Sequence, residues 1–201
     1  LRRGKPTVHV RFGQARALLA GDALQALAFE LLTPEDGVPP AMQARLCRLL
    51  AQAAGADGMA GGQAIDLASV GRSLSEHELR HMHRLKTGAL LQASVVMGAA
   101  CGAPGPQAEQ ALAQYGAALG LAFQVVDDVL DVTQDSATLG KPAGKDAASD
   151  KPTYVSLMRL AAAQAHAEEL RGQAHAALAA SGLSDTRALA ALADMVVRRS
   201  H

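Results

Sequence analysis

The stretch LAFQVVDDVLD, residues 121–131, places three carboxylates within an apolar frame. In a helix, which advances about 100° per residue, Asp127, Asp128 and Asp131 share with Gln124 a face about 100° wide. The other positions are apolar, which predicts a largely buried helix rather than the alternative, a solvated acidic face. Buried carboxylates need a partner, and oxygen ligands of this kind suit Mg²⁺. The stretch therefore predicts a magnesium site on a core helix.

On both sides of this stretch the chain is a succession of helical patterns. It has 201 residues, of which 49% are hydrophobic and 2% aromatic, with no tryptophan. Alanine and leucine dominate, which favours helix, and no long segment alternates apolar and polar residues as a strand does. We expect helices over residues 7–32, 40–55, 56–69, 75–101, 107–133, 153–180 and 184–199. They predict an all-α bundle of long helices that forms one domain over residues 1–201.

Charge and cysteine content argue against several classes of protein. The 19 basic and 19 acidic residues cancel, whereas a general nucleic-acid binder is basic. Cys47 and Cys101 lie outside any metal-binding pattern, and we expect two reduced, buried thiols in a cytoplasmic protein. Residues 87–108 are uncharged over nearly the length of a membrane span, but glycines and prolines interrupt their last third. We therefore expect a core helix there and no membrane span.

Basic residues gather where they could bind an anion. They form the N-terminal pair, the residue before the uncharged stretch, and part of a polar loop after the acidic helix: Arg2, Arg3, Lys86, Lys141, Lys145 and Lys151. Cationic side chains beside carboxylate-held magnesium would make a site for a diphosphate or triphosphate. Ordinary surface patchiness is the alternative on charge segregation alone. The sequence has no GxxxxGK[ST] loop, so a P-loop nucleotide site is not expected.

A second motif, HELRH at residues 77–81, matches the HExxH signature of zinc peptidases. In that interpretation His77 and His81 bind zinc and Glu78 acts as the base. No third ligand follows at the spacing that a metzincin requires. Ser75 and Glu78 fit an S-x-x-E capping box at the start of a helix instead, and we expect that structural role.

Several segments in a fixed order resemble the trans-isoprenyl diphosphate synthase family, and within it the bacterial farnesyl diphosphate synthases. FQ followed by DDVLD (127–131) is similar to the family's second aspartate-rich motif. The remaining segments extend the likeness over essentially the whole chain: LRRGKPTVHV (1–10), GDALQALAFELL (21–32), GGQAIDL (61–67), KTGALLQASVVMGA (86–99) and LGKPAGKDAASDKPTY (139–154). The resemblance implies an all-α isoprenoid-synthase fold around a central cavity, of which this chain would form the C-terminal two-thirds.

The same resemblance implies an enzyme with a metal cofactor. It implies a homodimer that condenses an allylic diphosphate, dimethylallyl or geranyl, with isopentenyl diphosphate to give farnesyl diphosphate. Three Mg²⁺ ions would bind with the substrate diphosphate and stabilise it as it leaves. An apolar cavity would exclude water from the allylic cation, and the released diphosphate would accept the final proton. The alternatives are a geranylgeranyl diphosphate synthase and a non-catalytic helical subunit of a heteromeric synthase.

Roles for single residues follow from the positions that match the family's motifs. Of the four acids at the metal site, Asp127 would bind magnesium directly, Asp128 and Asp131 would hold its waters and neighbouring lysines, and Asp146 would be a further acid in the loop. The substrate diphosphates would be held by five cations: Arg2, Arg3, Lys86, Lys141 and Lys151. The catalytic residues would be Lys86, Thr87 and Gln124, of which the last two would also contact substrate. The cavity would be lined by Gln63, Asp66 and Phe123.

One part of the family's pattern is absent from this sequence. In the family, the first aspartate-rich motif immediately precedes the segment that residues 1–10 resemble. We therefore expect the natural protein to extend upstream of Leu1 and to carry that motif there, since Mg²⁺ needs ligands from more than one side. The chain from Leu1 alone is expected to be inactive, and product length is expected to depend on residues just before the missing motif.

Overall fold

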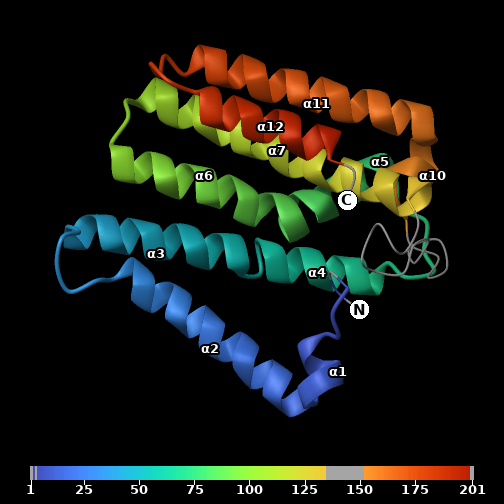
Figure 1. Cartoon of the computed structure of the whole chain (residues 1–201), viewed down its shortest axis with the longest axis horizontal. Helices are drawn as coiled ribbons and strands as arrows, with labels where there is room; N and C mark the ends of the chain where they lie inside the picture. The colour runs from blue at the N-terminus through green and yellow to red at the C-terminus, as the bar shows by residue number, and fades with distance from the viewer. Residues whose placement is uncertain (1, 3, 135–151, 200–201) are drawn as a thin grey trace.

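The computed structural model describes residues 2, 4–134 and 152–199, and most of them are helical (Figure 1). In this part of the chain the β structure is limited to an isolated bridge between Arg2 and Lys5. The prediction of an all-α protein is confirmed. The helices are α1 (Val8–Phe12), α2 (Gln14–Leu32), α3 (Pro40–Ala54), α4 (Met59–Ala68), α5 (Glu76–His83), the π-helix η1 (Arg84–Gly88), α6 (Ala89–Gly102), α7 (Pro106–Thr133), α10 (Tyr154–Met158), α11 (Leu160–Ala180) and α12 (Arg187–Arg198).

Two of the expected helices are each broken at one residue with a positive φ. The helix expected over residues 7–32 breaks at Gly13, whose φ of 88° is easily reached only by glycine. The helix expected over residues 153–180 breaks at Arg159, whose φ is 71°. Both predictions of a continuous helix were wrong. Gly13 was a stop signal that the prediction passed over, whereas Met158 and Leu160 beside Arg159 are good helix formers and give no local stop signal.

The helix expected over residues 75–101 is present as an unbroken helical run over residues 76–102, but its middle turn is π-helical, which the sequence did not predict. A single π-helical segment, η1, separates α5 from α6. A π-helix takes its hydrogen bonds from residue i to i+5, so it widens the backbone locally, and such segments frequently occur at functional sites. Lys86 and Thr87 both lie in η1.

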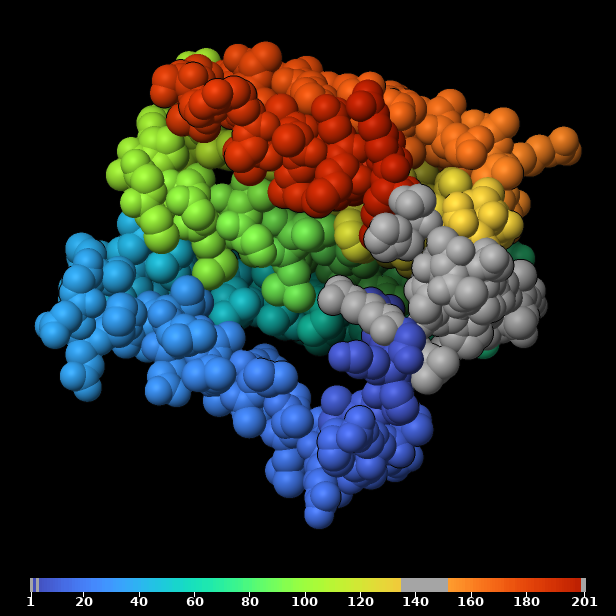
Figure 2. All heavy atoms as spheres, viewed as in Figure 1, coloured from blue at the N-terminus to red at the C-terminus, as the bar shows by residue number. Residues whose placement is uncertain are grey.

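Helix α7 is the centre of the bundle. It packs against α6, α11 and α12, and it also contacts η1 (Figure 1). On the far side of α6 lies α3, and α4 packs against η1. The first two helices extend away from the rest of the molecule, as the space-filling view shows (Figure 2). The carboxylate-bearing stretch is therefore part of the best-covered helix of the fold.

Helix α2 differs from the others because it is apolar but not covered. No residue of α1 or α2 is buried. Leu18, Leu19, Leu24 and Leu31 are each between 66% and 72% exposed. These leucines form an apolar surface that no described part of the chain covers, whereas a solvated helix normally presents polar side chains on its outer face.

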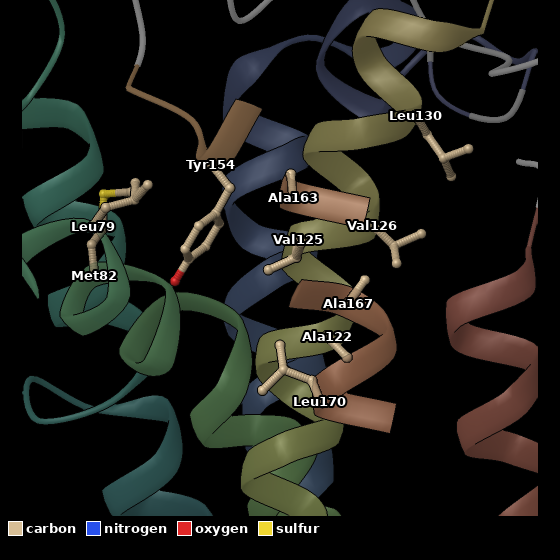
Figure 3. Packing of buried hydrophobic residues seen from close by; sticks show 10 residues of the cluster. All are labelled: Leu79, Met82, Ala122, Val125, Val126, Leu130, Tyr154, Ala163, Ala167 and Leu170. Carbon is tan, nitrogen blue, oxygen red and sulfur yellow. The ribbon is translucent and has the colours of Figure 1, made fainter. Parts of the chain in front are cut away.

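Two clusters of buried residues pack along α7, one on each half of the helix. The first, which we name the Tyr154 core, surrounds the carboxylate-bearing half and consists of Leu79, Met82, Ala122, Val125, Val126, Leu130, Tyr154, Ala163, Ala167 and Leu170 (Figure 3). The second, the Tyr115 core, surrounds the N-terminal half and consists of Leu112, Tyr115, Ala118, Leu119, Ala174, Ala177, Leu178, Ala193 and Val196. Small side chains in both cores let the helices approach closely.

Glycines allow the closest approaches, and these position η1. A Cβ atom on Gly62 of α4 would overlap the backbone nitrogen of Lys86. A Cβ atom on Gly120 of α7 would lie 2.7 Å from the Cα atom of Gly88, closer than real Cβ atoms come. The backbone of η1 is thus held between α4 and α7 at distances that only glycine permits.

Two further expectations concern membranes and cysteines. In the part of the chain that the structure describes, no helix is long and apolar enough to cross a membrane. Neither cysteine forms a disulfide, but Cys47 is only half-buried and Cys101 is exposed. The expectation of buried thiols was wrong, because Cys101 lies in the last turn of α6, where the helix end is open to solvent.

Candidate active site

Lys86, which lies in the π-helical segment η1, forms an ion pair with Asp66 of the neighbouring helix α4. The Lys86 Nζ atom donates a hydrogen bond of 2.9 Å to Oδ2 of Asp66, whose side chain is buried. The lysine side chain is itself about 29% exposed. Lys86 is thus anchored on one side and open on the other. Both residues were predicted to belong to the site, but their pairing was not predicted.

A chain of hydrogen bonds links η1, α7 and α10. The hydroxyl of Thr87 donates to Oε1 of Gln124 over 3.0 Å, and Nε2 of Gln124 donates to Oδ1 of Asp128 over 2.9 Å. The backbone N–H of Tyr154 donates to the other oxygen of Asp128, also over 2.9 Å. We name these four residues the relay. Two of the predicted catalytic residues, Thr87 and Gln124, are therefore in direct contact.

The three carboxylates of DDVLD differ in their surroundings. Asp128 and Asp131 are 2% and 4% exposed, whereas the side chain of Asp127 is 39% exposed. Among the described residues, no group of three or more histidine, cysteine or acidic side chains is placed to hold a metal ion. Asp127 and Asp131, one helical turn apart, still fit a cation that takes one or two carboxylates and completes its shell with phosphate oxygens and water.

Arg199, which follows α12, covers the apolar side of this turn. Its guanidinium lies 3.9 Å from the centroid of the Phe123 ring and donates a 3.0 Å hydrogen bond to the carbonyl oxygen of Phe123. Its Nη2 atom lies 3.7 Å from Oδ1 of Asp127. Burial lowers the pKa of Arg199, and the charge of Asp127 opposes that shift. Sequence reasoning missed Arg199, because its contacts with residues 123 and 127 span more than seventy positions of the chain.

His83 is a second buried polar residue that the sequence did not single out. It is 4% exposed, and its ring stacks on Tyr154 with centroids 5.7 Å apart. Its Nε2 atom lies 4.0 Å from Oδ2 of Asp128. The one sequence feature that could have identified His83 is its position. In the run HELRHMH (77–83) this histidine lies on the apolar face of the helix, beside Leu79 and Met82.

The remaining predicted residues divide into two groups. Arg2 is exposed, and its side chain makes no hydrogen bond or ion pair with any described residue. Gln63 lies half-buried on α4. Five predicted residues lie outside the described part of the chain: Arg3, Lys141, Lys145, Lys151 and Asp146.

The HELRH motif serves as a helix start. The Ser75 side chain accepts a hydrogen bond from the Glu78 backbone, and the Glu78 carboxylate accepts from the Ser75 backbone over 2.8 Å. The Ser75 hydroxyl also donates to this carboxylate over 2.7 Å, and this hydrogen bond, together with that from the Ser75 backbone, lowers the pKa of Glu78. The predicted capping box is confirmed, and it engages the carboxylate that a zinc peptidase would need as its base.

A groove of about 580 Å³ runs between α6, α7 and α11 and is lined mainly by alanine, with Leu121 and Leu170. Arg80 and Arg84 stand among its lining residues. None of the predicted catalytic or metal-binding residues that the structure describes lines this groove, and neither does any residue of the relay.

Comparisons with known proteins agree with the geometry. The sequence model of the family described as "Polyprenyl synthetase" matches residues 1–188. A protein of Sinorhizobium fredii named "Probable farnesyl diphosphate synthase" is 50% identical over 204 residues, which cover 100% of this chain and 60% of that protein. This chain therefore spans about 60% of the length of that relative.

Solved structures give the same result. A geranyltransferase from Helicobacter pylori, complexed with magnesium and isoprenyl diphosphate, has a TM-score of 0.85 and 32% identity, covering 98% of this chain and 64% of that one. A geranylgeranyl pyrophosphate synthetase from Pyrococcus horikoshii has a TM-score of 0.87 and 30% identity, covering 99% and 72%. Because this family model covers residues 1–188 and a relative is 50% identical over the whole chain, the chain belongs to the polyprenyl synthetase family.

Proposed function

We propose that the protein is a farnesyl diphosphate synthase, which condenses dimethylallyl or geranyl diphosphate with isopentenyl diphosphate. The observation that carries this proposal is the contact of Thr87 with Gln124, one turn before Asp127, on a chain of this family. This contact joins the segment beginning at Lys86, which in family members would contact the allylic cation, to the aspartate-rich motif, which would bind the metal. The likeness to the Sinorhizobium fredii protein supports the fifteen-carbon product.

Magnesium is the proposed cofactor, with three ions as the proposed number. The Helicobacter pylori geranyltransferase that resembles this chain binds magnesium together with isoprenyl diphosphate, which supports the choice. When bound, the metal would neutralise charge on the departing diphosphate. Asp127 is the proposed direct ligand because its side chain is open, with Asp131 and Asp128 on the same helix and Asp146 in support.

The chain's own side chains would bind and orient the substrates. We propose that Lys86 reaches the allylic diphosphate from its anchored position on Asp66, with Lys141, Lys151 and Arg2, and that Arg3 binds isopentenyl diphosphate. Thr87 and Gln124 would present oxygen dipoles to the allylic cation. Because Thr87 donates its hydrogen to Gln124, the lone pairs of its hydroxyl oxygen remain for that cation.

The proposed assembly is a homodimer, and the proposed compartment is the cytoplasm. Four leucines of α2 that are two-thirds exposed supply an apolar surface that a second copy of the chain would cover. Two thiols outside any disulfide suit a reducing compartment. Light scattering would give the mass of the assembly, and a monomer at micromolar concentration would contradict the dimer.

The test of the function is a product analysis on the protein as its gene encodes it. The protein is incubated with Mg²⁺, isopentenyl diphosphate and dimethylallyl or geranyl diphosphate, and product chain lengths are read by chromatography. We expect farnesyl diphosphate. A twenty-carbon product would favour geranylgeranyl synthesis, which the likeness to the Pyrococcus horikoshii enzyme keeps as the second candidate. No product with any primer would favour a non-catalytic subunit.

A further inference from the structure

We propose that the groove between α6, α7 and α11 binds a linear hydrocarbon chain that ends in a carboxylate, as a fatty acid does. The head group would lie against Arg84, and the chain would run along the alanines of α7 and α11. The condensation proposed above uses Lys86, Thr87 and Gln124, none of which lines this groove. The groove would therefore be a second binding site, and its occupation does not depend on the proposed function.

The groove has the size and the lining of a site for a small apolar ligand. Its floor consists of buried residues that are small or apolar: Gly88, Ala118, Leu170 and Ala177. Its volume of about 580 Å³ lies within the range of about 300–1,000 Å³ that small-molecule clefts occupy. Because most of the floor side chains are short, a chain of methylene groups can lie along them and leave water, and each buried methylene raises the affinity by up to about fourfold.

The charged residues that line the groove are both cations. Arg80 and Arg84 stand one helical turn apart, and none of the described lining residues is acidic. Arg80 donates to Glu76 over 3.1 Å, but both side chains are about half exposed, so this pair contributes little. Arg84 forms no ion pair with any residue that the structure describes, and its Nη2 atom lies 3.2 Å from Nδ1 of His81. A guanidinium can only donate, so that histidine nitrogen accepts and carries no proton. The positive charge of Arg84 therefore stays uncompensated at the end of an apolar groove.

This distribution of charge favours a carboxylate over a diphosphate as the head group. One guanidinium without an acidic partner matches one negative charge, and its parallel N–H groups match the two oxygens of a carboxylate. A diphosphate carries more negative charge and is normally bound with magnesium, for which no acid stands among the described lining residues. Glu76, beside Arg80, would repel the excess charge. We therefore expect isoprenoid diphosphates to prefer the site that contains Lys86.

The groove borders the candidate active site through η1. Arg84 and Gly88, the first and last residues of η1, both line the groove. Lys86 and Thr87 lie between them and make their side-chain hydrogen bonds with α4 and α7 instead. A ligand in the groove would contact η1 without contacting these two residues. Its binding should slow backbone amide exchange over η1 and over residues 173–180 of α11. Slower exchange over the aspartate-rich motif alone would contradict this position of the ligand.

Isothermal titration calorimetry with dodecanoate, below its micelle concentration, tests the site on the protein as its gene encodes it. Ala176 lines the groove, whereas Ala179, which is also exposed on α11, lies outside it. Ala176→Phe should weaken dodecanoate binding by about tenfold or more, because the added ring occupies the groove. The matched variant Ala179→Phe should change the affinity by about twofold or less. Equal effects of the two variants, or no binding by the wild-type protein, would overturn the proposal.

Charge variants test the place of the head group. Arg84→Gln should weaken dodecanoate binding by about tenfold, because a charge-assisted hydrogen bond is lost. Arg48→Gln removes the same charge from an exposed position of α3 and should change the affinity by about twofold or less. Arg84→Glu should bind dodecylammonium more tightly than dodecanoate, which reverses the order of the wild-type protein. If Arg84→Glu keeps the wild-type order, the carboxylate does not lie at Arg84 and the proposal is wrong.

Farnesyl diphosphate separates the groove from the proposed active site. In the presence of Mg²⁺ its affinity should stay within about twofold of wild type in Ala176→Phe, and it should not displace dodecanoate from the wild-type protein. Displacement would place dodecanoate in the isoprenoid site. A loss of farnesyl diphosphate affinity in Ala176→Phe as large as that of dodecanoate would make the groove a diphosphate site. Either result contradicts the proposal. These measurements need no turnover, so a failure of the proposed function is seen separately, as the lack of product.

Discussion

The two halves of α7 build cores of different chemistry on one helix. In the Tyr115 core the buried polar group is a phenol, whose hydroxyl donates a 2.8 Å hydrogen bond to the carbonyl oxygen of Leu189. The Tyr154 core surrounds His83, Asp128 and Asp131, all of which are at most 4% exposed. Burying carboxylates costs free energy unless hydrogen bonds compensate, and proteins keep such groups mainly at functional sites. The first half therefore buries mainly apolar side chains, and we propose that the second half carries the chemistry.

The largest expected effect comes from Asp127 in the second half of α7, where a substitution should lower activity without lowering stability. Asp127→Ala should lower the rate of product formation by about 10²–10³, the usual cost of losing a key electrostatic group. Its melting temperature should stay the same or rise, because one of three like charges on a helix face is removed. Steady-state kinetics and thermal unfolding measure the two effects. Activity within about threefold of wild type would contradict the metal assignment.

The next prediction compares the stability effects of alanine at Gly62, which packs against η1, and at Gly172, which lies on an open face of α11. Gly62→Ala should lower the free energy of unfolding by about 2 kcal/mol or more, because the added methyl group overlaps the backbone of Lys86. Gly172→Ala, on an open face of α11, should raise it by about 0.5–1 kcal/mol, since nothing stands within 4 Å of the new atom. Urea denaturation gives both values. Equal effects would mean that η1 is not held tightly against α4.

The two tyrosines offer a matched pair of small deletions. Tyr115→Phe should lower the free energy of unfolding by about 1 kcal/mol, because the Leu189 carbonyl loses its donor. Tyr154→Phe should be neutral or stabilising, because the buried Tyr154 hydroxyl has no hydrogen-bond partner among the described residues. Chemical denaturation of both variants tests the difference. If Tyr154→Phe lowered the free energy of unfolding more than Tyr115→Phe, the hydrogen bonding described for the two tyrosines would be contradicted.

The smallest expected effect concerns the attachment of α12 to α11. Asp194 accepts hydrogen bonds from His175 and Arg171, at 2.8 and 2.9 Å, and these hold the pKa of its carboxyl below the usual value. A lowered pKa in the folded state stabilises the protein above the unfolded pKa of about 4, and the gain is lost as the pH falls through the folded value. Asp194→Asn should therefore melt slightly below wild type at pH 7, and the difference should begin to shrink as the pH falls below about 4 and vanish only below the folded pKa. A difference that grows on acidification would contradict this pairing.

Sequence reasoning predicted what depends on local pattern. The helix expected over residues 107–133 is α7 to within one residue, and the capping box of Ser75 is present. The pattern also placed Gln124 and the three acids on one helix. It could not separate Asp127 from Asp128, because the difference comes from α5 and α10, which cover only one of them. A helical wheel describes one helix by itself, so it does not show which neighbouring helix covers each face.

The contacts that were missed share a physical cause. The partner of Asp128 is a backbone N–H of residue 154, which any residue but proline could supply, so the sequence carries no signal for it. Arg199 reaches Phe123 through the packing of α12 on α7, and it lies beyond the residues that the family model matches. The π-helical segment at Lys86 likewise follows from tight packing of Gly62 and Gly120 and from no property of RLKTG itself.

Hydrogen exchange along α7 tests the central contrast most directly. Backbone amide exchange is measured by mass spectrometry with and without Mg²⁺ plus a non-reactive analogue of geranyl diphosphate. Binding slows the local opening of the elements that contact a ligand. We predict at least about tenfold slower exchange over residues 123–131 and little change over residues 111–119. Equal protection of both halves, or protection of residues 111–119 alone, would contradict a metal and diphosphate site on the second half of α7.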